Sequence, residues 1–311
     1  MQNKRKGALY GQAIGDALGA FYEFSGQLKP GEKARYMDTR QGFAAGEWTD
    51  DTDQAIVLIK AFTLAPDDMP AAARLCASGF QTWLANDGRD CGFLTSDVLN
   101  HPAYASEPLQ VAEEIWEKGG KKSAPNGSVM RAVGVPLVRP WDPVWILEAA
   151  SVGCRTTHAD PRCVASTLAM SVACAALLKG AGIKGALQQG IAAGYAVTPG
   201  IAKYLTMSLK DLDLNGEGVG YTFKCVGAGF WALREFQRRD DECYDDMWPD
   251  RFEDILNDII REHGDTDTNA AVAGALMGAY IGFDNLPPAL VAGLQRKQEL
   301  DDLLAKLPKV P

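Results

Sequence analysis

Two short acidic segments are the residues of this sequence whose types and spacing most clearly suggest chemistry. The first, 47–53, reads E-W-T-D-D-T-D, and the second, 263–269, reads H-G-D-T-D-T-N. A single Asp or Thr is enough to cap a helix, whereas each segment offers several Asp residues with Thr interleaved. Two carboxylates about 4 Å apart repel by about 4 kcal/mol at an effective dielectric constant of about 20, so such crowding favours a bound cation.

The ligand types restrict which cation can bind. Carboxylate and hydroxyl oxygens indicate Mg²⁺, Mn²⁺ or Ca²⁺ instead of zinc. An EF-hand is excluded, because Leu276 and Thr222 stand where loops starting at Asp265 and Asp211 would need their closing acid. If the two acidic segments converge in space, they form a two-cation site that can hold phosphate or sugar hydroxyls and acidify a water. Each segment taken alone is also compatible with ordinary capping of a helix N-terminus.

Two glycine series could provide that convergence. Glycine recurs every four residues at positions 7, 11, 15 and 19, and again at 274, 278 and 282. On an α-helix this spacing places each series on one stripe, where another backbone can approach unusually closely. We therefore expect these two helices to pack against each other in the core, which would bring residues 15–23, 49–51 and 265–268 together.

The hydrophobic pattern predicts an all-α fold, because apolar residues recur at helical spacing in Ala-rich stretches and alternating strands are nearly absent. We expect roughly a dozen helices in one compact orthogonal bundle, with residues 1–311 forming a single domain. The acidic stretch 238–250 is expected to be a solvated loop between helices. The helical segments are 53–62, 70–85, 109–119, 161–180, 229–239, 252–264, 269–282 and 300–307.

Composition restricts the partners and the compartment. The chain has 311 residues with 31 Lys and Arg against 40 Asp and Glu, a formal net charge of −9 that argues against non-specific nucleic-acid binding. Its seven cysteines are odd in number and form no C-x-x-C pair, so we expect buried free thiols in a reducing cytoplasm. No segment approaches the roughly 20 apolar residues of a membrane span, so we expect a cytoplasmic protein without membrane contact.

Five motifs together resemble the ADP-ribosylglycohydrolase family. In chain order they are G-D-A-L-G-A-F-Y-E (15–23), W-T-D-D-T (48–52), N-G-S-V-M-R (126–131), T-H-A-D-P (157–161) and G-D-T-D-T-N-A (264–270). The resemblance covers roughly residues 6–285, and the paired T-D-D-T and G-D-T-D-T motifs are its most specific part. It implies an all-α fold, a binuclear Mg²⁺ or Mn²⁺ centre, and hydrolysis of the N- or O-glycosidic bond between ADP-ribose and a side chain.

The resemblance also implies roles for individual residues around the metal centre. Six positions match the family's metal ligands: Thr49, Asp50, Asp51, Asp265, Asp267 and Thr268. Glu23 and Asp51 match catalytic positions, with one of them accepting a proton from the attacking water. The alternative for Glu23 is a surface or capping role. At the level of the whole protein, the alternatives are a non-catalytic ADP-ribose-binding or structural family member and another metal-dependent nucleotide hydrolase.

The implied substrate contacts come from three other segments. The loop containing Ser123, Asn126, Gly127, Ser128 and Met130 would hold the diphosphate and ribose. His158 would bind the ligand as a neutral imidazole, although a capping or core role fits it equally well.

Asp90 and Gly92 match a weaker family element, from which the sequence departs at Cys91. The aromatic residue that contacts adenine stays open among Tyr22, Phe93 and Tyr221. The expected partner is an ADP-ribosylated protein or another ADP-ribose conjugate, and the expected state is a monomer. The linkage that is cut is also open.

Overall fold

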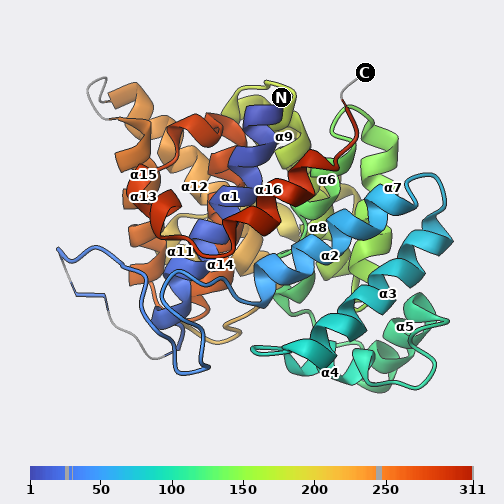
Figure 1. Cartoon of the computed structure of the whole chain (residues 1–311). Helices are drawn as coiled ribbons and strands as arrows, with labels where there is room; N and C mark the ends of the chain where they lie inside the picture. The colour runs from blue at the N-terminus through green and yellow to red at the C-terminus, as the bar shows by residue number, and fades with distance from the viewer. Residues whose placement is uncertain (25–27, 30, 243–246, 310–311) are drawn as a thin grey trace.

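In the computed structural model, which describes residues 1–24, 28–29, 31–242 and 247–309, the regular elements are all helices (Figure 1). The all-α prediction is confirmed. The sixteen α-helices of the described residues are α1 (Gln2–Gly19), α2 (Asp50–Leu64), α3 (Met69–Asn86), α4 (Phe93–Leu99), α5 (Pro108–Lys118), α6 (Gly134–Val138), α7 (Pro143–Arg155), α8 (Pro161–Leu178), α9 (Ile183–Val197), α10 (Ile201–Thr206), α11 (Leu209–Leu212), α12 (Thr222–Glu242), α13 (Trp248–Arg261), α14 (Thr266–Ile281), α15 (Pro288–Gly293) and α16 (Lys297–Ala305).

The glycine stripes of α1 and α14 face each other, as the sequence predicts. A Cβ added at Gly11 would lie 2.2 Å from the carbonyl oxygen of Gly274, and one added at Gly274 would lie 2.1 Å from that of Gly11. The two helices run antiparallel, because Gly7 meets Gly278 at one end and Gly19 meets Asp267 at the other. The C-terminal end of α1 therefore lies against the N-terminal start of α14.

The core surrounds this pair. Nearly every residue of α14 is buried, and α1 is buried from Gly7 to its end. The central helix α8 is apolar and long enough to match a membrane span by length and composition, but 83% of that segment is buried inside the protein, as in a core helix. Aspartates cap several helices: Asp68, Asp142 and Asp160 accept hydrogen bonds from backbone amides at the starts of α3, α7 and α8.

Two expectations need correction. The described residues form more helices than the predicted dozen, because short helices such as α6, α10 and α11 carry too little periodic sequence to be recognised. The stretch 238–250 is not a loop throughout: residues 238–242 complete α12, and 248–250 begin α13. Its charges pair along the helix, since Arg238 forms ion pairs with Glu235 and Glu242. Residues 243–246 lie outside the described part of the chain.

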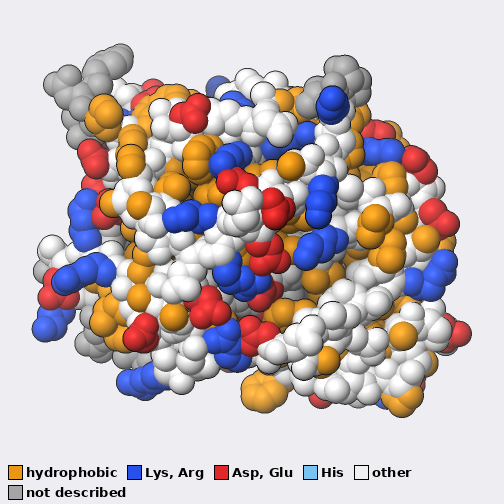
Figure 2. Space-filling model, viewed as in Figure 1, with side chains coloured by type: hydrophobic (Ala, Val, Ile, Leu, Met, Phe, Trp, Pro, Cys, Tyr) orange, Lys and Arg blue, Asp and Glu red, His pale blue; other side chains and the backbone are white. Residues whose placement is uncertain are grey.

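The cysteines follow the expected pattern with one departure. Cys76, Cys154, Cys163, Cys174 and Cys225 are buried free thiols, and Cys243 lies outside the described residues. Cys91 is free but only partly buried, because it lies in the loop before α4. On the face shown in Figure 2, basic and acidic side chains are interspersed and do not separate into patches of one sign.

Candidate functional site

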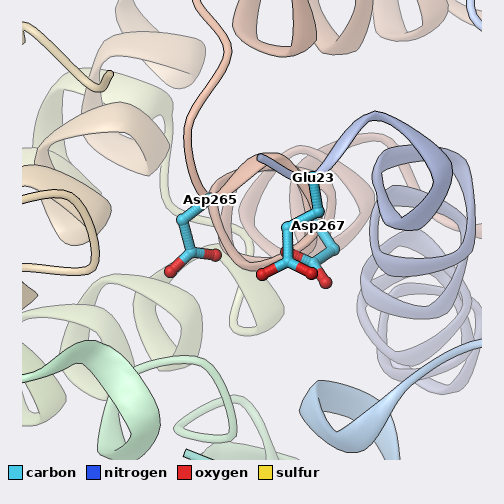
Figure 3. A group of neighbouring side chains, drawn as sticks. All are labelled: Glu23, Asp265 and Asp267. Atoms are coloured by element: carbon cyan, nitrogen blue, oxygen red, sulfur yellow. The ribbon is translucent and has the colours of Figure 1, made fainter. Parts of the chain in front are cut away.

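Three carboxylates meet where α1 ends and α14 begins. Glu23 follows the short 3₁₀ helix Ala20–Tyr22 that extends α1, while Asp265 and Asp267 lie at the first turn of α14. Each offers one oxygen, and these oxygens lie within 4.8 Å of one another (Figure 3). All three residues are buried. The antiparallel packing of α1 on α14 therefore brings together side chains about 240 positions apart in the sequence.

The start of α2 joins this group through a buried carboxylate in α1. Asp16 Oδ1 accepts hydrogen bonds from the backbone amide and the hydroxyl of Thr49, both at 2.8 Å. Its Oδ2 accepts from the amide and hydroxyl of Thr52, at 3.0 and 2.6 Å. Gln12 adds a hydrogen bond to the Asp51 carbonyl at 3.0 Å. These contacts fix the turn that carries Asp50 and Asp51.

The donor set fits divalent cations. Asp51 Oδ1 and Asp265 Oδ1 are buried, and neither has a hydrogen-bond partner among the described residues. A buried oxygen without a partner costs free energy, and a cation would satisfy it. The nearby oxygens come from carboxylates and from the hydroxyls of Thr49 and Thr268, which is the chemistry that Mg²⁺, Mn²⁺ and Ca²⁺ prefer.

Burial and mutual repulsion shift the acids of this site strongly. Burial, with added repulsion from Asp90, Asp265 and Asp16, raises the pKa of Glu23 to about 9. Burial likewise raises the pKa of Asp16 to about 7, although its four hydrogen bonds oppose the shift. For Asp50, Asp51 and Asp267, burial and neighbouring carboxylates raise the pKa well above its usual value. A cation among these oxygens would favour the charged forms.

A cavity of about 740 Å³ opens onto the acids. This volume lies within the range of small-molecule sites. Twelve of the fifteen predicted site residues line it: Glu23, Asp50, Asp90, Gly92, Ser123, Asn126, Gly127, Met130, His158, Asp265, Asp267 and Thr268. The structure therefore brings most of the predicted site together around one opening.

The other three predicted residues, Thr49, Asp51 and Ser128, lie behind the cavity wall. Thr49 and Asp51 are almost fully buried and hydrogen bond to each other at 3.3 Å. Ser128 is also buried, and its hydroxyl accepts a hydrogen bond from Thr167 at 3.2 Å. The structure thus gives Ser128 a contact within the protein.

The loop before α6 lines the cavity next to the acids. Its backbone is tied down by the hydrogen bond from the Asn126 amide to the Gly220 carbonyl at 2.9 Å. The Asn126 side chain donates to Asp265 Oδ2 at 2.8 Å, which connects this loop to the acidic group. A Cβ at Gly127 would lie 3.0 Å from Cε1 of His158, so the imidazole packs directly against the loop.

His158 is buried and lines the cavity. Its Nδ1 lies 2.7 Å from the Thr157 hydroxyl. Burial, together with the charge of Arg131, lowers the pKa of His158 well below its usual value, so the ring is neutral near pH 7. A neutral imidazole offers one donor and one acceptor to a ligand.

Sequence reasoning gave no role to two residues that support the site. Asp16 is one, and its only signal was its place in the G-D-A-L-G motif. Arg131 is the other, at the end of N-G-S-V-M-R: its buried guanidinium donates to Gln54 Oε1 at 2.6 Å, and Gln54 donates to Asp50 Oδ2 at 2.9 Å. These two hydrogen bonds link the Asp50 carboxylate to the buried Arg131 through Gln54.

Arg89 holds a turn that contacts Glu23, and we call this set of contacts the Arg89 clamp. Arg89 hydrogen bonds to the Gly42 carbonyl at 2.8 Å and to Glu47 at 2.7 Å, and its guanidinium lies 3.9 Å from the centre of the Phe43 ring. The turn that it holds carries Gln41, whose amide donates to Glu23 Oε2 at 3.1 Å. Arg89 therefore couples this turn to the loop that carries Asp90.

The chain is similar to known proteins over nearly its whole length. The sequence matches the family described as ADP-ribosylglycohydrolase over residues 1–311. It is 26% identical to the ADP-ribosyl-[dinitrogen reductase] glycohydrolase of Rhodospirillum rubrum, over 96% of this chain and 92% of that protein.

Two further relatives extend the comparison. The chain is 23% identical to the ADP-ribosylarginine hydrolase Tri1 of Serratia proteamaculans, over 98% of this chain and 79% of that protein. A solved structure described as an ADP-ribosylglycohydrolase-related protein complex aligns with a TM-score of 0.77 at 25% identity, covering 98% of this chain and 96% of that one.

Proposed function

Because this chain belongs to the ADP-ribosylglycohydrolase family, we propose that it hydrolyses the bond between ADP-ribose and a modified arginine side chain, using two Mg²⁺ or Mn²⁺ ions. The observation that carries the proposal is the placement of Glu23, Asp265 and Asp267 on the same cavity as the loop around Asn126 and His158. The acids suit cations, and the adjoining loop suits a phosphate-bearing ligand.

The residues that would hold the cations are Asp50, Asp51, Asp265, Asp267, Thr49 and Thr268. When bound, such ions supply positive charge that can fix ribose hydroxyls and acidify a water. Asp51 lies behind the wall with an unpartnered oxygen, so we assign it to ion binding. Glu23 lines the cavity itself, so of the two catalytic candidates we assign proton transfer to Glu23.

The reaction then follows from the positions of the side chains. The bond between the anomeric carbon and the leaving nitrogen breaks through an oxocarbenium-like state, and its electron pair leaves with the arginine side chain. A water adds to the anomeric carbon as this bond breaks, and the proton of that water passes to the carboxylate of Glu23. The leaving nitrogen regains a proton from Glu23 or from solvent, which balances the reaction.

Other residues that line the cavity would orient the substrate. The backbone amides of Gly127 and Ser128 suit phosphate oxygens, and neutral His158 suits a ribose hydroxyl or phosphate. Asp90 lines the cavity close enough to Glu23 for their charges to interact, which suits a guanidinium leaving group. The Tri1 relative, which is named as an ADP-ribosylarginine hydrolase, supports the same choice.

The proposal is tested by supplying proteins ADP-ribosylated on arginine or on serine and measuring released ADP-ribose by chromatography. Release from the arginine conjugate is expected. Release only from the serine conjugate would show that the enzyme cuts the serine linkage and not the proposed arginine linkage. Release from neither conjugate, with Mg²⁺ or Mn²⁺ present, would contradict hydrolysis. Binding of ADP-ribose without release would support the non-catalytic alternative.

A further inference from the structure

Two phenylalanines are exposed at the mouth of the cavity. Phe93 is 94% exposed and Phe24 is 64% exposed, and both line the cavity. The chain has eleven phenylalanines, and the other nine are buried or half-buried. A large apolar ring left in water beside a binding site is a common sign of an interaction surface.

The backbone at both positions is held in place. Phe24 has a positive φ of 49°, a conformation that a bulky residue rarely adopts, and its amide donates to the Gly264 carbonyl at 3.0 Å. Phe93 is the first residue of α4. The rings are therefore presented from fixed points and belong to no hydrophobic core cluster of the described residues.

These positions flank the part of the cavity near the acids. Phe24 directly follows Glu23, and Phe93 is three residues beyond Asp90, whose charge interacts with those of Glu23 and Asp265. The loop from Ser123 to Gly127 also lines the cavity, and its Asn126 side chain donates to Asp265. With ribose at the acids and diphosphate at that loop, the group attached to the anomeric carbon would lie in the same cavity as the two rings.

We propose that Phe24 and Phe93 bind the target polypeptide beside its modified side chain, and thereby favour ADP-ribosylated proteins over small conjugates. The inference rests on the proposed function for the direction in which the substrate lies. The partner surface is an apolar or aliphatic side chain next to the modified residue. Aromatic anchors of this kind often dominate the affinity of protein interfaces.

The test compares two probes: an arginine-ADP-ribosylated protein and free ADP-ribosyl-arginine. We measure kcat/KM on both probes for wild type, Phe93→Ala, Phe24→Ala and the double variant. Calorimetry on the same four proteins gives the Kd for two ligands that cannot be hydrolysed, ADP-ribose and the unmodified target protein. These ligands are added singly and together. Tyr195→Ala is the matched control, because Tyr195 is an aromatic residue of α9 that is 53% exposed and does not line the cavity.

We expect each single variant to lower the ratio of kcat/KM for the protein to kcat/KM for the small conjugate by about tenfold, the size typical of an interface anchor. Tyr195→Ala should leave that ratio unchanged. An equal fall on both probes would overturn the inference and assign the ring to ADP-ribose, for example to its adenine. An unchanged ratio would also overturn it.

The two proposals fail in different ways. If wild type released ADP-ribose from neither probe, hydrolysis would be contradicted, while the calorimetry would still decide the docking surface. In that case, weaker binding of the target protein to Phe93→Ala than to wild type, with the same Kd for ADP-ribose, supports the surface. Equal binding of the target protein to both overturns it.

Discussion

Asp16 in α1 caps the first turn of α2 by accepting hydrogen bonds at Oδ2 from both the backbone amide and the hydroxyl of Thr52, at 3.0 and 2.6 Å. Its other oxygen makes the same pair of contacts with Thr49. One buried side chain thus satisfies four donors. It also determines where Asp50 and Asp51 lie relative to α14.

Replacing Asp16 should separate its structural role from its charge. Asp16→Ala leaves four donors without their acceptor and should lower the free energy of unfolding by about 3 kcal/mol. Asp16→Asn keeps one acceptor oxygen and should lose less. Urea denaturation measures both. A wild-type midpoint for Asp16→Ala would show that this carboxylate does not hold α2.

The glycine contact between α1 and α14 predicts a steric effect. Gly11→Ala places a methyl group 2.2 Å from the Gly274 carbonyl oxygen, so the helices must separate, at a cost of about 2–3 kcal/mol. Gly185→Ala is the control, because a Cβ at this helical glycine of α9 meets nothing within 4 Å. It should be neutral or stabilise by about 0.5–1 kcal/mol. Thermal unfolding of both variants measures the two changes in stability. Equal changes in stability would contradict the steric account.

Loss of the Arg89 clamp should lower activity while leaving the stability of the fold nearly unchanged. Arg89→Lys keeps the charge but loses the planar fork that reaches Gly42 and Glu47, so Gln41 is no longer held on Glu23. We expect kcat/KM for ADP-ribose release to fall by about tenfold. The free energy of unfolding should change by less than about 1 kcal/mol.

A matched control exists for this variant. Arg139 pairs with Asp67 and lies over the Trp145 ring, away from the cavity. Arg139→Lys should therefore leave kcat/KM unchanged. If Arg89→Lys and Arg139→Lys had the same activity, the turn at 39–43 would have no part in positioning Glu23.

Acid should weaken the hydrogen bonds that Asp160, at the start of α8, accepts from Arg162 and Trp116. Burial raises the pKa of Asp160, but hydrogen bonds from Arg162 and Trp116 outweigh it, and the pKa is lowered overall. A lowered carboxyl pKa stabilises the fold at pH values above the unfolded pKa of about 4, and this stabilisation is lost as the pH falls below it. The difference in unfolding free energy between wild type and Asp160→Asn should therefore shrink between pH 7 and pH 3. A difference that stays constant would contradict this account.

The long helices and the acidic site could be predicted because their signals are local or repeated. The apolar periodicity of α8 and the glycine spacing of α1 and α14 each depend on neighbours a few residues away. The high charge of 238–250 predicts a solvated loop, which is wrong for 238–242 and for 248–250; Arg238 pairs with Glu235 and Glu242 along α12. Such pairs favour a helix.

Other features depend on tertiary contacts that no spacing reveals. Asp16 caps α2 only because packing brings those helices together, and Arg131 reaches Asp50 only through Gln54. Phe24 has a positive φ and is exposed directly after the buried Glu23. In sequence, a buried and an exposed phenylalanine look alike.

The central claim is that the acids at the start of α14 hold the cations required for cleavage. It is tested most directly by measuring ADP-ribose release from an arginine-ADP-ribosylated protein after chelation and after return of Mn²⁺. Asp267→Asn is compared with Asp284→Asn, since Asp284 lies in the 3₁₀ helix after α14 and does not line the cavity. We predict that wild type and Asp284→Asn lose activity on chelation and regain it with Mn²⁺, whereas Asp267→Asn stays inactive. Full activity of Asp267→Asn, or release that is indifferent to the chelator, would contradict the claim.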